Sequence, residues 1–234
     1  AWFYATCDTS LMVGSNGLLK QVTPLPGGKH RFEWRTSHPM AYYLVSFAVG
    51  DYIDYSTYAK PVGYQDSILI QNYIYANPQC LSDYKYWIDN SDTLLELFSE
   101  KFGLYPFADE KYGHSMVPIG GGMEHQTMTS LGYFDFRLVA HEMAHQWFGD
   151  YITCATWMDI WVHEGWASYV EYISYENLWS MHDAGVWMAE AHRLSLKEPF
   201  GSVYVPVADA WNEGRIFAYW LSYKKGAAII HTLR

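Results

Sequence analysis

The chain has 234 residues, of which half are apolar and 18% aromatic, so it can bury a substantial hydrophobic core. Its 15 basic and 25 acidic residues give a formal charge of −10, and no basic cluster is present that could follow a phosphate backbone. This argues against nucleic acid as a partner. The most apolar stretch, residues 40–50, is too short for a helix that crosses a bilayer, so we expect no membrane span.

The cysteines and the two ends of the chain carry little information about function. The three cysteines lie far apart and form no C-x-x-C pair, which favours buried free thiols over a metal cage or a dense disulfide framework. Cysteine usage leaves the compartment open, with a secreted or periplasmic location slightly favoured over the cytoplasm. The chain begins without a signal-peptide pattern and stops inside a helical pattern at residues 226–234, so we expect a piece of a longer protein.

The first half of the chain has the pattern of a β structure followed by a helix. Turn residues separate short strands over residues 1–52, and residues 68–76 are rich in Ile and Tyr, which predicts a further strand. Apolar residues at helical spacing predict an amphipathic helix over residues 82–102, with Gly103 as its stop. Residues 111–118 are expected to be extended, and a glycine triplet follows at 120–122.

The second half is predominantly helical. The spacing of apolar residues predicts helices over residues 136–147 and 162–173, joined by an irregular connection. Residues 204–206 and 211–214 have loop composition, and a last helix is expected to begin near Phe217. The order of strands first and helices later predicts an α+β fold with its chemistry in the helical half.

One short motif suggests a metal site. His141-Glu142-Met143-Ala144-His145 has the H-E-x-x-H pattern inside a predicted helix, where residues four apart share one face, so both imidazoles can reach a single ion. Two imidazoles with a carboxylate suit zinc, which leaves a fourth position for a water of lowered pKa. Glu142 projects beside that water and can accept its proton as a general base. A five-residue pattern also arises by chance, so further residues must support it.

The next predicted helix supplies a third ligand. Glu164 follows His145 by 19 positions, a spacing that lets a helix, a loop and a second helix return a carboxylate to the ion. A glutamate in the first turn of a helix also occurs simply because it complements the helix dipole. His163 is an alternative ligand, but adjacent helical residues point about 100° apart, so only one of the two can face the metal.

Several longer runs share a resemblance with one known family. They are Gly121-Gly-Met-Glu-His125, His141-Glu-Met-Ala-His-Gln-Trp-Phe-Gly-Asp150, Trp157-Met-Asp-Ile-Trp161, His163-Glu-Gly-Trp-Ala167 and Tyr223-Lys-Lys-Gly-Ala227. In this order they resemble the motifs of the aminopeptidase N family of gluzincin metallopeptidases, including its G-x-M-E-N and Y-x-K-G segments. The similarity extends over nearly the whole chain.

The resemblance implies a fold and a domain organisation. Residues 52–234 are expected to form a thermolysin-like zinc metallopeptidase catalytic domain, truncated at its C-terminal side. Residues 1–51 are expected to be the C-terminal part of a preceding β-sandwich domain, with further domains of the parent chain as partners. The activity implied is that of a zinc-dependent aminopeptidase with one zinc ion, which removes N-terminal residues from peptides with a free N-terminus.

The resemblance also implies roles for individual residues. His141, His145 and Glu164 match the zinc ligands, with Glu164 completing the family pattern. Glu124 matches the glutamate that binds the substrate's α-amino group, which makes sense for a carboxylate facing an ammonium. The residues expected to assist are Gly121 and Gly122, which offer backbone groups to the peptide, Tyr223, which donates to the oxyanion, and Asp150 or Asp159, which could orient a ligand histidine.

Some features depart from the family pattern and leave other functions open. His125 and His163 stand where the family usually has asparagine, and Tyr219 competes with Tyr223 but lacks the Lys-Gly that follows. The alternatives are a thermolysin-type endopeptidase, an epoxide hydrolase, and a catalytically silent peptide-binding module. Retention of Glu142 argues against a silent module, because a structural zinc needs no base and is normally closed by four protein ligands.

Overall fold

The computed structural model describes all residues from 1 to 234, and the chain divides into two compact units, residues 1–139 and 140–234. Strands occur only in the first unit, and helices form almost all of the regular structure of the second. The predicted α+β class is therefore confirmed. The expected domain boundary after residue 51 concerns the family's domains and stays a prediction.

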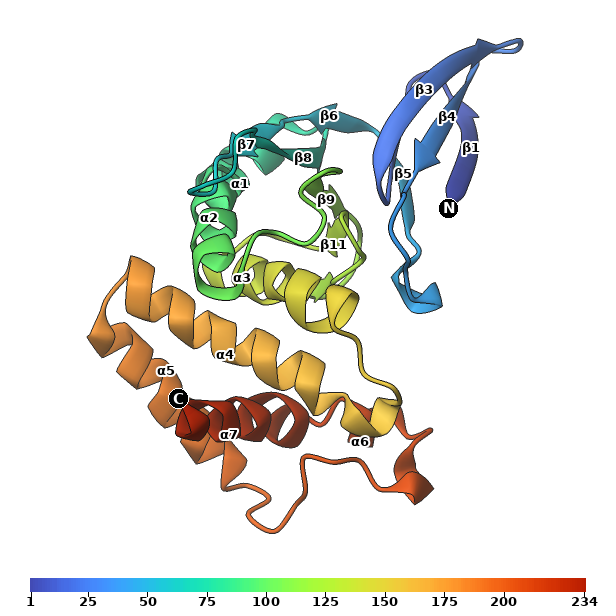
Figure 1. Ribbon diagram of the computed structural model, residues 1–234. Helices are drawn as coiled ribbons and strands as arrows, with labels where there is room; N and C mark the ends of the chain where they lie inside the picture. The colour runs from blue at the N-terminus through green and yellow to red at the C-terminus, as the bar shows by residue number, and fades with distance from the viewer. The chain divides into compact units, whose positions relative to one another are not determined.

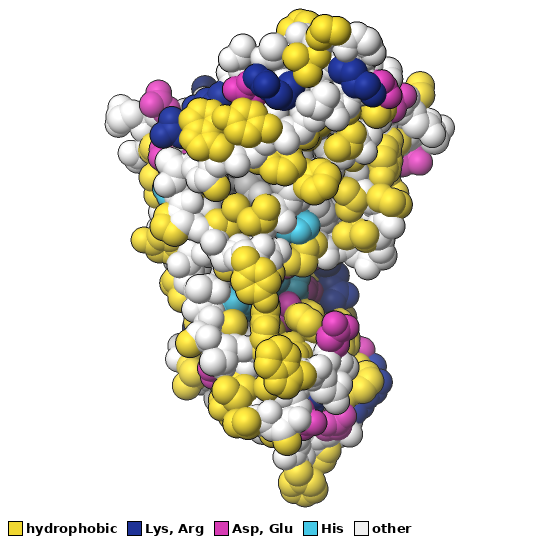
Figure 2. Space-filling view, turned by 90° about the vertical axis from the view of Figure 1, so that its right-hand side faces the viewer, with side chains coloured by type: hydrophobic (Ala, Val, Ile, Leu, Met, Phe, Trp, Pro, Cys, Tyr) yellow, Lys and Arg dark blue, Asp and Glu magenta, His cyan; other side chains and the backbone are white.

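The N-terminal part of the first unit consists of short antiparallel strands, as its turn residues predict. They are β1 (Trp2–Asp8), β2 (Met12–Ser15), β3 (Leu18–Leu25), β4 (Lys29–Arg35) and β5 (Phe47–Gly50). A three-stranded sheet has the order β1-β4-β3, and β2 pairs with β5. On β1 the exposed rings of Trp2 and Tyr4 lie beneath the guanidinium groups of Arg35 and Arg31. Figure 2 shows Lys and Arg side chains beside hydrophobic ones on this part of the surface.

A larger mixed sheet follows in the first unit. Its strands are β6 (Tyr52–Asp54), β7 (Thr57–Ala59), β8 (Ile68–Tyr75), β9 (Tyr112–Met116), β10 (Gly122–Met123) and β11 (Thr129–Leu131). The order is β10-β11-β9-β8-β6, with β7 also paired to β8. The central strands β8, β9 and β11 run parallel, and the edge strand β10 is antiparallel to β11. The strands predicted over residues 68–76 and 111–118 are confirmed as β8 and β9.

Two helices connect β8 to β9 and pack against β8 and β7 (Figure 1). They are α1 (Pro78–Asp89) and α2 (Ser91–Phe102). The single helix predicted over residues 82–102 is therefore wrong, because the chain breaks at Asn90, whose side-chain amide donates to the Tyr86 carbonyl at 2.6 Å. The predicted stop is confirmed, since Gly103 follows α2 with a φ of +93° that a glycine adopts without strain.

The second unit is built around one long helix. α3 (Phe136–Ala144) leads into it, followed by α4 (Trp161–Leu178), α5 (Met181–Ser195), the short α6 (Glu213–Ile216) and α7 (Gly226–Leu233). α4 packs against both α5 and α7 (Figure 1). Two π-helical turns, η2 (Gln146–Tyr151) and η5 (Tyr219–Lys225), precede α4 and α7. Short 3-10 turns are η1 (Tyr42–Leu44), η3 (Trp157–Asp159) and η4 (Val207–Asp209).

The helical predictions for this unit need four corrections. The helix expected over residues 136–147 ends at Ala144 and gives way to η2. The helix expected over residues 162–173 is longer at both ends, and α5 was not predicted at all. The last helix begins not as an α-helix near Phe217 but with the π turn η5.

The remaining chain-wide predictions concern thiols and membrane spans. All three cysteines are free thiols, as predicted, but only Cys7 is buried, whereas Cys80 and Cys154 are partly exposed. No helix has the length and apolar character that crossing a membrane requires.

Candidate metal centre and active site

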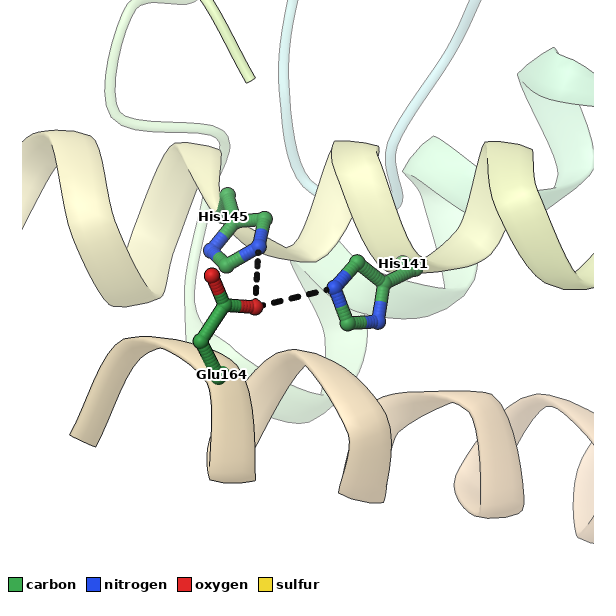
Figure 3. Close-up of side chains that lie close together, drawn as sticks. All are labelled: His141, His145 and Glu164. Carbon is green, nitrogen blue, oxygen red and sulfur yellow. Dashed lines mark hydrogen bonds and ion pairs between the residues drawn. The ribbon is translucent and has the colours of Figure 1, made fainter. Parts of the chain in front are cut away.

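Three predicted ligands converge in the second unit. α3 carries His141, His145 directly follows it, and α4 carries Glu164 in its first turn. The Oε2 atom of Glu164 lies 3.2 Å from Nε2 of His141 and 3.4 Å from Nε2 of His145 (Figure 3). The structure therefore brings together the i, i+4 histidine pair and the carboxylate from the next helix.

The opposite nitrogen of each imidazole meets an acceptor. Nδ1 of His141 lies 2.9 Å from Oε1 of Glu171, and Nδ1 of His145 lies 3.1 Å from the Phe148 carbonyl oxygen. When Nδ1 donates to these oxygens, Nε2 keeps its lone pair for a metal ion. Gly149 leaves room for the His145 ring, because a Cβ on that residue would lie 3.2 Å from His145 Nδ1 and press on the imidazole.

The local electrostatics favour positive charge at this point. Burial lowers the pKa of His141, but hydrogen bonds to Glu164 and Glu171 more than offset this and raise the pKa to about 10. Burial alone would raise the pKa of Glu164, yet the charge of His145 and the hydrogen bonds from both imidazoles hold it well below its usual range. The carboxylates thus stabilise a cation beside the imidazoles, whether a proton or a metal ion.

The donor set fits zinc. Zinc binds imidazole nitrogens and carboxylate oxygens at about 2.0–2.2 Å in a tetrahedral arrangement, which places neighbouring ligand atoms about 3.4 Å apart. The observed separations of 3.2 and 3.4 Å match this value. Three protein ligands with one open position are typical of a catalytic rather than a structural zinc site.

The predicted catalytic residues lie beside these ligands. Glu142 is buried on α3, and one of its carboxylate oxygens lies within 4.8 Å of a ring nitrogen of His145. The Tyr223 ring in η5 is nearly parallel to the His141 ring, with their centroids 5.9 Å apart. The ring of the alternative candidate, Tyr219, contacts the Tyr223 ring, with the two centroids 5.7 Å apart.

A close helix crossing brings η5 to the metal centre. Gly165, next to Glu164 on α4, faces Gly226, the first residue of α7. A Cβ at Gly226 would lie only 2.9 Å from the Gly165 Cα, so both positions must stay without a side chain for the backbones to approach. The glycine that follows the lysines after Tyr223 therefore has a packing function.

His163 makes a different kind of contact from the three ligands. Its Nε2 accepts a hydrogen bond from the backbone N–H of Cys154 at 2.7 Å. Burial, together with the charge of His145, lowers its pKa to about 4, so the ring is neutral at pH 7. This geometry directs His163 toward the η2–α4 connection and not toward Glu164.

The predicted substrate-binding residues belong to the first unit. Gly121 precedes β10, Gly122 begins it and Glu124 follows it directly. Gly121 has a φ of +111°, and its carbonyl accepts from the Gly132 N–H at 2.8 Å, which fixes the turn into the strand. His125, the departure from the family motif, lies 3.0 Å from the Ser130 hydroxyl through Nδ1, and burial lowers its pKa to about 4.

The group that contacts Nδ1 of His141 is not among the residues predicted from the sequence. We expected Asp150 or Asp159 to orient a ligand histidine, but the acceptors at the two Nδ1 atoms are Glu171 and the Phe148 carbonyl. Glu171 lies seven residues after Glu164 on α4, two helical turns along the same face, and this spacing could have identified it. Its Oε2 accepts from Trp187 Nε1 at 2.8 Å and lies 3.5 Å from Lys224 Nζ.

Comparison with known proteins agrees with these features. The chain is 28% identical over 252 residues to Aminopeptidase 2 of Candida albicans, covering 97% of the chain and 26% of that protein. It is 28% identical over 249 residues to Endoplasmic reticulum aminopeptidase 1 of Homo sapiens, covering 96% of the chain and 25% of that protein. The chain thus spans about a quarter of the length of these relatives.

A solved structure and a family model add the fold and the family. The crystal structure of an M1 zinc metallopeptidase from Deinococcus radiodurans superposes with a TM-score of 0.81 at 24% identity, covering 100% of this chain and 51% of that one. The likeness shows a shared fold. The model described as "Peptidase family M1 domain" matches residues 86–234. Because this match covers more than half of the chain, the protein belongs to peptidase family M1.

Proposed function

We propose that the complete protein is a zinc-dependent aminopeptidase that hydrolyses the N-terminal peptide bond of peptides. The observation that carries the proposal is the convergence of two Nε2 atoms and the Glu164 carboxylate, with Glu142 and Tyr223 beside them. Membership of peptidase family M1 supports peptide hydrolysis, and two relatives bear aminopeptidase names. Endopeptidase and epoxide hydrolase activities find no comparable support.

In this proposal His141, His145 and Glu164 hold the zinc. A bound zinc ion supplies Lewis-acid polarisation of the scissile carbonyl and lowers the pKa of the attacking water. The Glu142 carboxylate accepts the proton of that water and later delivers it to the nitrogen of the leaving amine. The Tyr223 hydroxyl donates a hydrogen bond to the carbonyl oxygen as negative charge develops on it. Glu171 keeps Nδ1 of His141 protonated, so that Nε2 faces the metal.

Glu124 is proposed to restrict cleavage to the N-terminal peptide bond of the substrate. Its carboxylate is proposed to bind the α-ammonium group of the substrate, which fixes how far the peptide extends beyond the scissile bond. Gly121 and Gly122 have no side chain of their own, so a peptide can approach the backbone of the preceding turn and of β10 closely. The physical basis is charge pairing, so a substrate without the ammonium group should lose the stabilisation that its contact with Glu124 provides.

The experiment that tests the proposal compares free and N-acetylated aminoacyl substrates. The complete zinc-loaded protein should cleave the free substrates and reject the acetylated ones. In Glu124→Ala the preference should fall by about one to two orders of magnitude, because a hydrogen bond to a charged group contributes about 1.5–3 kcal/mol. The measurement is kcat/KM for both substrate series.

Two variants serve as controls for this experiment. Glu124→Gln keeps the size of the side chain and removes its charge, so it should lose most of the preference as well. Glu100→Ala removes an exposed glutamate from α2 and should keep the full preference. Efficient cleavage of acetylated substrates by the unmutated protein would exclude the aminopeptidase function and leave zinc-dependent hydrolysis intact.

A further inference from the structure

A buried lysine lies next to Glu171, the carboxylate that contacts His141. Lys224 is only 2% exposed, although it carries an ammonium group. Its Nζ lies 3.5 Å from Oε2 of Glu171 and 4.3 Å from the centre of the Trp187 ring. The Tyr219 ring also faces Nζ, at 5.1 Å. Because a buried charge is costly unless it is paired, the side chain is held in one place by its carboxylate partner and two aromatic faces.

The carboxylate that pairs with Lys224 is the one that orients a zinc ligand. Glu171 is itself 5% exposed and receives three donors. Oε1 meets His141 Nδ1 at 2.9 Å, while Oε2 meets Trp187 Nε1 at 2.8 Å and Lys224 Nζ at 3.5 Å. The two carboxylate oxygens thus contact different groups. Oε1 contacts the zinc ligand His141, and Oε2 contacts side chains of α5 and η5.

The contacts of Lys224 and Glu171 also connect to Tyr223, because Lys224 and Tyr223 are adjacent in the chain. Lys224 is the neighbour of Tyr223 in η5, and the Tyr223 ring lies against the His141 ring at 5.9 Å with an interplanar angle of 16°. One path between Tyr223 and His141 is therefore this direct ring contact. The other path runs through Lys224 and Glu171. The position of Tyr223 relative to the His141 imidazole is therefore fixed by two contacts, the ring contact and the Lys224–Glu171 ion pair.

The geometry points to Lys224 as a positioning residue that, through its ion pair with Glu171, holds Tyr223 in register with the zinc ligand His141. The inference rests on the proposed function, since it assigns Lys224 an effect on the donor of that reaction. The contacts of Lys224 are with Glu171, Trp187 and Tyr219, so its effect on the reaction is indirect.

The turn that carries Tyr223 depends on such an anchor. η5 is a π-helical turn of seven residues, and π turns are less favourable than α-helix and persist where other contacts hold them. Without the ion pair, Lys224 would no longer fix the rotation of this turn about its axis. A displacement of about 1 Å at a reacting group can cost about 10²-fold in rate, even when substrate binding is unchanged.

The experiment replaces Lys224 by methionine, which keeps the length of the side chain and removes its charge. In the complete zinc-loaded protein, Lys224→Met should lower kcat by about ten- to a hundredfold per bound zinc, with KM changed by less than about threefold. Lys224→Arg, which keeps the charge, should recover most of the lost kcat. Should the methionine variant not fold, Lys224→Gln takes its place, with a loss in the same direction.

Lys225→Met is the matched control. Lys225 belongs to the same turn, but its Nζ donates to the carbonyls of Glu198, Pro199 and Gly201 instead of pairing with Glu171. This variant loses three hydrogen bonds from η5, and so it can lower the melting temperature. It should nevertheless keep kcat per bound zinc within about threefold, because its contacts do not lead to Tyr223.

A double variant separates positioning from a general structural effect. If Lys224 acts through Tyr223, then Lys224→Met should lower kcat by less than about threefold in a Tyr223→Phe background, because the donor is already gone. Additive losses would overturn the inference, as would unchanged kcat per bound zinc in Lys224→Met. Either outcome leaves the proposed function intact as long as the unmutated protein turns over substrate normally. If the unmutated protein shows no turnover, the proposed function and the inference about Lys224 are both overturned.

Discussion

Glu142→Gln should leave the zinc bound and lower kcat by about 10²–10⁴-fold, the usual contribution of a general base. Glutamine keeps the size of the side chain, so the packing of this buried position is preserved. It cannot accept the proton of the attacking water at neutral pH. The measurement is kcat per bound zinc, with the zinc content determined on the same sample.

A glutamate outside the centre provides the control for this variant. Glu190 lies on α5, where it forms an exposed ion pair with Arg193. Glu190→Gln should keep full activity and full zinc content. Loss of zinc from Glu142→Gln would assign Glu142 to the ligand set instead, and normal turnover would remove it from the reaction.

Tyr223→Phe should reduce kcat by about 10²–10³-fold, equivalent to about 2.7–4 kcal/mol, as for the loss of a single oxyanion donor. The phenyl ring can keep its contact with His141, so zinc binding and KM should change little. The effect should therefore appear in kcat, measured under saturating substrate.

Tyr219→Phe is the corresponding control, because Tyr219 lies in the same π turn and was the competing candidate. Its hydroxyl is not expected to reach the reacting carbonyl, so turnover should stay close to that of the unmutated protein. If Tyr219→Phe lost activity while Tyr223→Phe kept it, the two roles would have to be exchanged.

The metal centre could be predicted because its geometry is largely local. Residues four apart on a helix share a face, so formation of the helix alone places His141 and His145 next to each other. Glu164 required a long-range pairing of two helices, which the sequence suggested only through spacing and resemblance. The structure brings it within hydrogen-bonding reach of His141 Nε2 at 3.2 Å.

The orienting network was harder to predict, for a physical reason. Two adjacent lysines follow Tyr223, and nothing in the local sequence says which one turns inward. The π turn decides it by placing Lys224 toward Glu171 and Lys225 toward the loop at residues 198–201. Sequence periodicity assumes 3.6 residues per turn, so it assigns the wrong faces in a π-helical segment.

The missed secondary structure has two separate origins. The signal for α5 was present, since Ser180 precedes the helix and its hydroxyl accepts from the Asp183 N–H at 3.1 Å, a typical N-cap. The break at Asn90 between α1 and α2 gave no comparable signal. Asparagine is tolerated within a helix pattern, and the break appears only in the structure, where Asn90 has a φ of −81° and a ψ of 0° and its side chain donates to the Tyr86 carbonyl.

The most direct test of the central claim is the zinc content of purified variants, measured by elemental analysis. The unmutated protein should contain one zinc per chain, and His141→Ala, His145→Ala and Glu164→Ala should each lose most of it. His163→Asn should keep the metal, because that side chain contacts the Cys154 backbone. Full zinc occupancy in any of the three alanine variants, or loss of zinc only in His163→Asn, would contradict the proposed metal centre.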